Sequence, residues 1–509
     1  MSASVPLTRS IARHALAVCI GFVFFVPLSA AFHQDSLAWP LRAFVVVLTG
    51  LSAAGPALGV MALSVLLPMA LVMASAAGWI LSTAQISDAC LLAVVAGLSL
   101  RLTGRAQGTE RLRNLAVALG AAVLTSGLVE LHSLNVVAPQ RPVWDEVRHH
   151  LTIGYWSEPR EFPVLHLVYR WLAGLTLAVF VERVLRASAR QGPLMVRLWI
   201  VGGLAGAGLT VVGLMEQILA GGLSTAEAVE WVLHTARLSV LQPDLNAAGS
   251  YFGLFLLPAV VVGWRRRDHW MLALAAPLLA LAFLVARSRA AIGALVAVGC
   301  MSWACSLHRN WVARLGLGAA AVTLGVSLAL VAMTSRLHVG MEQAAVVRAQ
   351  LAEAGLEAAK RHPVFGVGIG EYILRTRRFI TPEMDVLWRF APGGENAHDN
   401  YLQILVELGI PAVVLFVALT GSVVLAGWPG PGRRHSPEAH GMSLGVAAFL
   451  ASALFGHPLL VPEVFGVFFL AVGLTAGTTS LPALPRGRRR FILPAIAGFY
   501  VISLAWRLW

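Results

Sequence analysis

Long apolar runs alternate with short polar segments along almost the whole chain. Runs of about 17 or more apolar residues are long enough to cross a bilayer as a helix. Runs of this kind lie near residues 14–32, 42–56, 58–80, 86–101, 114–131, 163–182, 198–218, 245–264, 269–286, 290–307, 315–334, 403–427, 441–457, 464–482 and 491–508. This pattern predicts an all-α polytopic membrane protein with about 12–15 transmembrane helices. The first run is expected to be a retained helix rather than a cleaved signal peptide.

Composition excludes the main classes of soluble protein. The chain is 58% hydrophobic and 12% charged, whereas soluble domains carry about 25% charged residues. The 38 Lys and Arg residues against 25 Asp and Glu give a net charge of +13, but they flank apolar runs, as the cytoplasmic ends of membrane helices do. We therefore expect this chain to lie in a lipid bilayer and not to bind nucleic acid. The four cysteines lie in apolar runs without metal-ligand spacing, so neither a disulfide nor a zinc site is expected.

The arginines also predict the orientation of the chain. With the N-terminus inside, the dense clusters near residues 101–113, 183–197, 265–267, 309–314, 433–434 and 486–490 all fall on one side. Three long segments, 132–162, 219–244 and 335–402, then lie outside. The segment 335–402 is the most hydrophilic and is expected to begin as a helix, which ends before Pro363. A loop of this length is uncommon as a simple connection, so we expect this segment to contribute to function.

Three arginines break the positive-inside pattern and are candidates for ligand binding. Arg237 precedes the span near residues 245–264, and Arg287 and Arg289 occupy a very short outside turn. Such side chains can extend to the lipid headgroups without any further role. Guanidinium groups fixed at the outer surface would also suit a phosphate or diphosphate ligand, which they can bind bidentately.

A second group of polar residues follows at the end of the large outside loop. Asp399 or Asn400 is expected to cap the next helix, and Gln403 and Glu407 lie one turn apart on one face of it. His398 precedes this helix start, where anions are attracted and where an imidazole could take a proton from an attacking hydroxyl. A surface or capping histidine is the alternative interpretation.

Other patterns compete with these candidates. His457 with Glu463 forms another outside histidine and acid pair, and is a rival for the role of base. Glu130 and Glu216 lie at outer helix ends and could serve a proton-coupled transporter. The glycines at 366, 368 and 370 lack the features of a nucleotide-binding loop and predict a tight turn.

Metal binding is not expected. Two adjacent histidines, His149 and His150, follow Asp145 and Glu146, but this spacing does not suit one metal ion.

At these residues the chain resembles the O-antigen ligase and polymerase superfamily of bacterial inner-membrane proteins. Four patches carry the resemblance, in order along residues 195–430. They are Arg237 with Pro243, Asp244, Leu245 and Asn246; Ser288, Arg289 and Ala290; Arg348 with His362 to Gly370; and His398, Asp399 and Asn400 with Gln403, Glu407 and Gly409. The last two patches are the most specific. Residues 1–194 and 431–509 match only as further transmembrane helices.

The resemblance implies an enzyme of the cytoplasmic membrane with its active site facing the periplasm. Such an enzyme transfers a glycan from an undecaprenyl-diphosphate donor to a hydroxyl acceptor, by inversion and without a metal or other cofactor. Residues matching Arg237 and Arg289 would hold the diphosphate, and the residue matching His398 would activate the acceptor. Substrate-binding roles are then expected at Asn246, Arg348, Asn400, Gln403 and Glu407. Arg287 is an extra arginine outside the pattern; we expect it to strengthen the diphosphate site, with extension to the lipid headgroups as the alternative.

The sequence leaves the acceptor open. A ligase passes the glycan to lipid A-core or a similar surface glycan, a polymerase to another lipid-linked repeat, and a protein O-oligosaccharyltransferase to Ser or Thr. The short C-terminal loops favour the first two over the third. A transporter or lipid flippase is the rival from another class, but the sequence shows neither repeated halves nor charges grouped in mid-span.

Overall fold

The chain folds into a bundle of helices. The computed structural model describes residues 18–29, 39–76, 82–101, 110–137, 142–152, 154–156, 163–234, 236, 238, 244–307, 338–379, 396–429 and 435–479. Every regular element within these residues is helical, and they contain no strand. The all-α prediction is therefore confirmed. Two predicted spans, near residues 315–334 and 491–508, lie outside the described residues.

The helices follow the apolar runs closely. A first helix spans Val18–Ser29. The others are α2 (Trp39–Ala54), α3 (Pro56–Leu66), α4 (Ala70–Ala76), α5 (Thr83–Arg101), α6 (Glu110–Val137), α7 (Val143–Thr152), η1 (Gly154–Trp156), α8 (Pro163–Ala187), η2 (Ala189–Gln191), α9 (Gly192–Ala220), α10 (Thr225–His234), α11 (Leu245–Arg266), η3 (Met271–Ala275), α12 (Ala276–Ala286), α13 (Arg289–Leu307), α15 (His338–Arg361), α16 (Tyr372–Thr376), η4 (Arg377–Phe379), α18 (Asn400–Gly427), α19 (Pro437–Ser452), η5 (Pro458–Leu460) and α20 (Pro462–Thr478).

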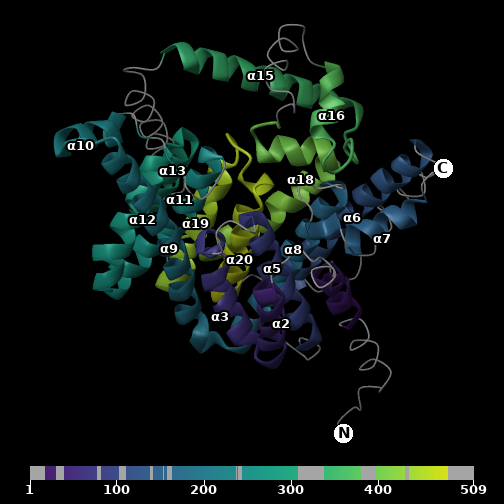
Figure 1. The fold of residues 1–509 in the computed structure, drawn as a ribbon, viewed down its shortest axis with the longest axis horizontal. Helices are drawn as coiled ribbons and strands as arrows, with labels where there is room; N and C mark the ends of the chain where they lie inside the picture. Colours follow the sequence, from purple (N-terminus) through teal and green to yellow (C-terminus); the bar gives the residue numbers. More distant parts are fainter. Residues whose placement is uncertain are drawn as a thin grey trace.

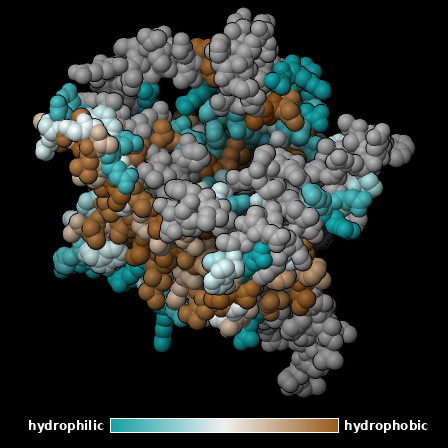
Figure 2. All heavy atoms as spheres, viewed as in Figure 1, coloured by the Kyte–Doolittle hydropathy of each residue, from teal (hydrophilic) through white to brown (hydrophobic). Residues whose placement is uncertain are grey.

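Six of the described helices are long and apolar enough to cross a membrane by length and composition. They are α5, α6, α8, α9, α11 and α18, and shorter apolar helices stand beside them. Hydrophobic side chains cover much of the visible face of the bundle, and hydrophilic ones gather near α16 above it (Figure 2). This arrangement agrees with a polytopic membrane protein.

The predicted span at residues 58–80 is wrong as a single helix. The chain turns at Gly55, and α3 then runs from Pro56 to Leu66 before a turn at residues 67–69 separates it from α4. Pro68 lies in that turn. It has no N–H to continue a helix, which accounts for the break inside an apolar run.

Small residues bring several helices into close contact. Gly441 and Gly445 of α19 face α11, and a Cβ on Gly445 would stand 2.5 Å from the backbone oxygen of Leu254. Gly473 and Gly477 of α20 face α8 in the same way. Both pairs have the four-residue spacing that lets membrane helices pack backbone to backbone. The site described below therefore stands on a closely packed scaffold.

One end of the bundle carries the hydrophilic helices. In Figure 1, α15 crosses above the bundle, α16 lies beside it, and the first part of α18 lies between them and the bundle. Helix α15 ends at Arg361, two residues before Pro363, as predicted. Its residues Leu351, Ala354 and Ala358 are buried, which confirms the expected apolar face.

Candidate functional site

The starts of three helices and one connection meet at this end of the bundle. Asp244 caps α11, Ser288 and Arg289 begin α13, His398 precedes α18, and residues 453–457 connect α19 to η5. Contacts between these segments link three of the four patches that carried the resemblance.

His398 and His457 lie side by side at the centre of this site. Their ring centroids are 4.8 Å apart. Nε2 of His457 lies 3.3 Å from Oδ2 of Asp244, whose other oxygen accepts the backbone N–H of Asn246 at 2.7 Å. The two histidines that the sequence presented as rivals therefore belong to one site. A carboxylate beside an imidazole can hold its orientation and stabilise its protonated form.

The backbone of His398 is in the left-handed region, with φ at +50°. Few residues other than glycine adopt this conformation, although histidine is among those enriched there. Strained backbone of this kind gathers at functional sites, where the surrounding structure maintains it. Here the surroundings are the start of α18, where Asp399 accepts the N–H groups of Tyr401 and Leu402 at 2.8 and 3.1 Å.

The sequence predicted Asp399 or Asn400 as the cap of this helix, and the structure has Asp399. Burial raises the pKa of the Asp399 carboxyl group, and the two N–H groups oppose this shift.

Asn400 ties the start of α18 to the connection that carries His457. Its N–H donates to the backbone oxygens of Ala453 and Gly456, at 2.9 and 3.1 Å. Its side-chain oxygen accepts the N–H of Leu459 at 3.1 Å. With its side chain buried in these contacts, Asn400 fixes the two histidines relative to each other. Its predicted role in substrate binding remains a prediction.

The arginine turn adjoins the same site through Asn246. The hydroxyl of buried Ser288 donates to the side-chain oxygen of Asn246 at 3.5 Å, and Arg289 follows as the first residue of α13. Arg289 is exposed, whereas Arg287 is half-buried and donates to the backbone oxygen of Val232 at 3.4 Å. Ser288 therefore links the start of α13 to Asn246, whose backbone N–H bonds Asp244 beside His457. The role of Arg289 remains a prediction.

The other two predicted site residues add nothing to this description. Arg237 lies outside the described residues. Arg348 is exposed on α15. Their predicted roles stay predictions.

Gln403 and Glu407 share a face of α18, as predicted, and they bind each other. Nε2 of Gln403 lies 2.5 Å from Oε1 of Glu407, and the side-chain oxygen of Gln403 accepts the N–H of Ala397 at 3.2 Å. Both side chains are buried. These contacts hold the segment before α18 against the first turns of that helix.

Helix α18 is interrupted at Gly409, and the glycine-rich turn at residues 366–370 bonds the backbone oxygens left without partners there. Gly409 has φ of +83°, and Pro411 has no N–H to bond the oxygen of Glu407. The N–H of Gly368 bonds that oxygen instead, at 3.1 Å, and Val367 bonds the oxygen of Val406 at 2.7 Å. The predicted turn is therefore present, and its role is to satisfy the backbone of a broken helix.

The same turn rests on α6. The N–H of Ile369 donates to the hydroxyl of Ser126 at 2.9 Å, and Arg375 lies 4.0 Å from the carboxylate of Glu130. A Cβ on Gly368 would collide with that carboxylate. Glu130 thus anchors the hydrophilic helices to the bundle. Glu216, the other acid noted in the sequence, is exposed.

A buried charged group lies inside the bundle near the starts of α5 and α8, and the sequence analysis did not identify it. Nε2 of His166 lies 2.7 Å from Asp88, and Arg170 lies 3.3 Å from the same carboxylate. The Tyr155 ring packs against His166 with centroids 4.6 Å apart. The sequence interpretation missed this group because its members belong to different spans, α5 and α8, 78 residues apart.

The proposed pair of His457 with Glu463 is not formed. Glu463 accepts a hydrogen bond from Thr83, and His457 contacts Asp244 instead. Among the residues that the structure describes, no group of three or more His, Cys, Asp or Glu side chains could hold a metal ion.

Comparison with known protein families relates part of the chain to a described family. Residues 272–417 match the O-antigen ligase family, which confirms the resemblance to the O-antigen ligase superfamily. The matched region includes Ser288, Arg289, the glycine turn and His398, and it ends before His457. No curated protein and no solved structure matches the chain.

Proposed function

We propose that this protein is a membrane glycosyltransferase that moves a glycan from undecaprenyl diphosphate to a hydroxyl acceptor on the periplasmic side. One observation carries the proposal. Arg289, Ser288, Asn246, Asp244, His457 and His398 form a continuous series of neighbours, from an exposed guanidinium to a pair of imidazoles. Such a series offers an anion-binding end and a proton-accepting end within one site.

The guanidinium end suits the diphosphate of the donor. Arg289 is exposed at the start of α13, so its side chain can reach an anion at the membrane surface. A guanidinium can bind two phosphate oxygens at once and stabilise the charge that develops on the leaving group. Arg287 is held against the Val232 carbonyl and would assist less directly.

The imidazole end suits the acceptor. In the proposed step His398 takes the proton of the acceptor hydroxyl, and the oxygen attacks the anomeric carbon of the donor sugar. The bond from that carbon to the phosphate oxygen breaks, and undecaprenyl diphosphate leaves with the electron pair. Attack from the side opposite the leaving group inverts the anomeric centre. Asp244 holds His457 next to His398, where it stabilises the arrangement of the base.

A transfer assay with purified protein tests this proposal. The lipid-linked donor and candidate acceptors are supplied to detergent-solubilised wild type, His398→Ala and His457→Ala. His132→Ala is the matched control, because His132 is an exposed histidine on α6. The proposal expects loss of transfer in His398→Ala and unchanged transfer in the control. Full transfer by correctly folded His398→Ala would overturn it.

We propose ligation to lipid A-core or a similar surface glycan as the specific activity, with polymerisation of repeat units as the alternative. The O-antigen ligase family match supports the first. A deletion strain separates the two. Full-length but unligated lipid-linked polymer indicates a ligase, whereas single-repeat glycan indicates a polymerase.

The proposed location is the bacterial cytoplasmic membrane with the site facing the periplasm. Single cysteines placed on a background without the four native ones report the orientation when intact cells are labelled. Leu374 near the site and Trp264 at the other end of the bundle are both exposed positions for this purpose. Labelling at position 374 and not at 264 is expected. The reverse pattern would contradict both the orientation and the proposed reaction.

Transport of a lipid-linked glycan is the second candidate, and the buried group of Asp88, His166 and Arg170 favours it. Charged residues inside a membrane bundle often line ion or substrate pathways. In this protein they are joined to one another, as a structural group would be. Reconstituted vesicles distinguish the two, because a transporter moves the donor across the bilayer without consuming an acceptor.

A further inference from the structure

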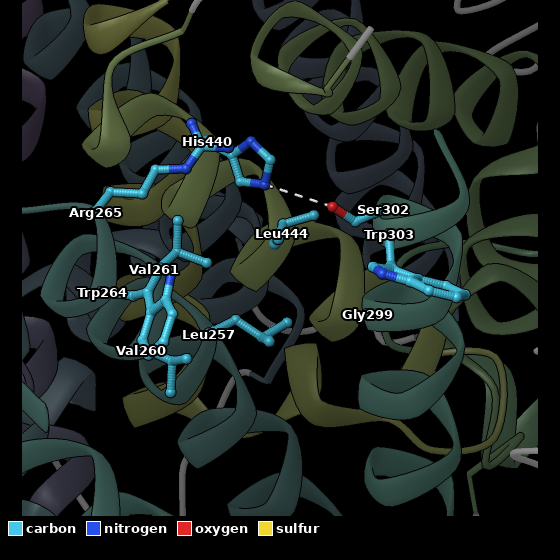
Figure 3. A pocket seen from close by; sticks show the side chains of 10 residues that line it. All are labelled: Leu257, Val260, Val261, Trp264, Arg265, Gly299, Ser302, Trp303, His440 and Leu444. Atoms are coloured by element: carbon cyan, nitrogen blue, oxygen red, sulfur yellow. Dashed lines mark hydrogen bonds between the residues drawn. The ribbon is translucent and has the colours of Figure 1, made fainter. Parts of the chain in front are cut away.

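A cleft lies at the opposite end of α11 from the histidine site. It has a volume of about 310 Å³ and is bordered by α11, α13 and α19 (Figure 3). Asp244 caps one end of α11, and Arg265 stands near the other, about 30 Å away at 1.5 Å per residue. This distance is close to the thickness of a bilayer core. The cleft is therefore separate from the proposed glycan site.

Most of the walls of the cleft are apolar. Leu257, Val261 and Leu444 line it, and the Trp264 and Trp303 side chains are 75% and 61% exposed at its border. Exposed tryptophans are typical of the boundary between hydrocarbon and headgroups. About two turns of α11 separate Leu257 from Arg265, so an apolar chain could enter alongside the helix.

The part of the cleft at Arg265 is cationic and polar. Arg265 lines it, and so do Ser302 and His440, whose Oγ and Nε2 atoms lie 3.4 Å apart. Figure 3 shows Arg265 beside His440 on the same side of the cleft. No carboxylate is among the lining residues.

Neighbouring arginines have acidic partners that Arg265 lacks. Arg266 pairs with Glu438 at 2.9 Å, and Arg197 pairs with Asp268 at 2.8 Å. Arg265 forms no ion pair with any residue in the described part of the chain. Its charge thus remains available to an external anion.

We propose that this cleft binds an anionic phospholipid, with the phosphate at Arg265 and one acyl chain along the apolar walls. The positive charge of Arg265 and the apolar walls together match this one class of molecule. Basic pockets between helices on the cytoplasmic side bind anionic headgroups in membrane proteins. A volume near 300 Å³ is at the lower end for ligand sites, which fits part of one lipid rather than a whole molecule.

Lipid binding to the purified full-length protein tests the proposal. Native mass spectrometry is used to titrate dioleoyl phosphatidylglycerol and, separately, dioleoyl phosphatidylcholine. We expect tighter binding of phosphatidylglycerol, and about a fivefold loss of that preference in Arg265→Gln. The control is Arg190→Gln, which removes an equal exposed charge from the turn between α8 and α9 and does not line the cleft.

A second variant tests the apolar walls of the cleft. Gly299 lines the cleft, and a Cβ added there would meet nothing within 4 Å. Gly299→Leu should therefore fill the cleft without disturbing the fold and should weaken binding of phosphatidylglycerol. Gly293→Leu is its matched control, because Gly293 lies on the same helix, has the same open surroundings and does not line the cleft.

The outcomes separate clearly. Selective binding that both cleft variants weaken, and that both controls leave intact, supports the proposal. Equal affinity for the two lipids, or the same loss in Arg265→Gln and Arg190→Gln, would overturn it. Because no glycan donor is present, these results do not depend on the proposed transfer reaction.

Discussion

Replacement of His398 by glycine separates its backbone from its side chain. The residue sits at φ of +50°, where an ordinary side chain costs about 1–2 kcal/mol. Glycine removes that cost, but it adds about 0.5–1 kcal/mol through its greater freedom in the unfolded chain. The two contributions partly offset each other, so the stability of His398→Gly should lie within about 1.5 kcal/mol of the wild type.

The same variant should lose most of its activity. A positioned general base contributes about 10² to 10⁴ in rate, which is about 2.7–5.4 kcal/mol of transition-state stabilisation. His398→Asn is a useful companion, because asparagine tolerates positive φ and keeps a hydrogen-bonding side chain without a basic nitrogen. We expect both variants to unfold near the wild-type temperature and to transfer glycan at least a hundredfold more slowly.

The assay pairs thermal unfolding in detergent with initial rates of transfer from the lipid-linked donor. His457→Ala is compared in parallel, because His457 lies beside His398 and contacts Asp244. Activity in His398→Gly together with none in His457→Ala would refute the reasoning and make His457 the base. A merely structural His398 would instead show a loss of stability that accounts for the loss of rate.

Three further predictions concern residues around this site. Arg289→Ala should reduce transfer about tenfold or more, and Arg289→Lys should restore it only in part, because lysine cannot bind a diphosphate bidentately; initial rates with the lipid-linked donor test this, and full activity in the Ala variant would contradict it. Gly409→Ala should destabilise the protein by about 2 kcal/mol, since its Cβ would meet the Val364 oxygen at 2.3 Å and its φ is +83°; Gly421→Ala on the same helix, with open surroundings, should leave thermal unfolding unchanged. Asp88→Asn should cost about 3 kcal/mol in the same measurement, because Arg170 would lose its buried anion; an unaltered unfolding temperature would show that the group is not structural.

Local features of the site could be predicted from the sequence. The cap at Asp399, the pairing of Gln403 with Glu407 and the end of α15 before Pro363 all depend on residues within one or two turns of each other. Helix capping, helix periodicity and the missing N–H of proline determine them.

Contacts between distant segments could not be predicted in the same way. His457 meets His398 because the connection after α19 is tied to Asn400 by backbone hydrogen bonds, and no periodic pattern in the sequence encodes such bonds. The grouping of Asp88 with His166 depends on how α5 packs against α8. The division of residues 58–80 into α3 and α4 did have a local signal, Pro68. The sequence analysis overlooked it because the whole run is apolar.

The break in α18 explains why the glycine turn packs against this helix. A helix that crosses a membrane must have its backbone hydrogen bonds satisfied within the protein. The break at Gly409 leaves the oxygens of Val406 and Glu407 without their partners from α18, and the N–H groups of Val367 and Gly368 bond them instead. Gly366 has a positive φ, and a Cβ there would meet the backbone of Glu407 at 2.3 Å. We therefore expect Gly366→Ala to lower the unfolding temperature, and an unchanged unfolding temperature would contradict this account of the turn.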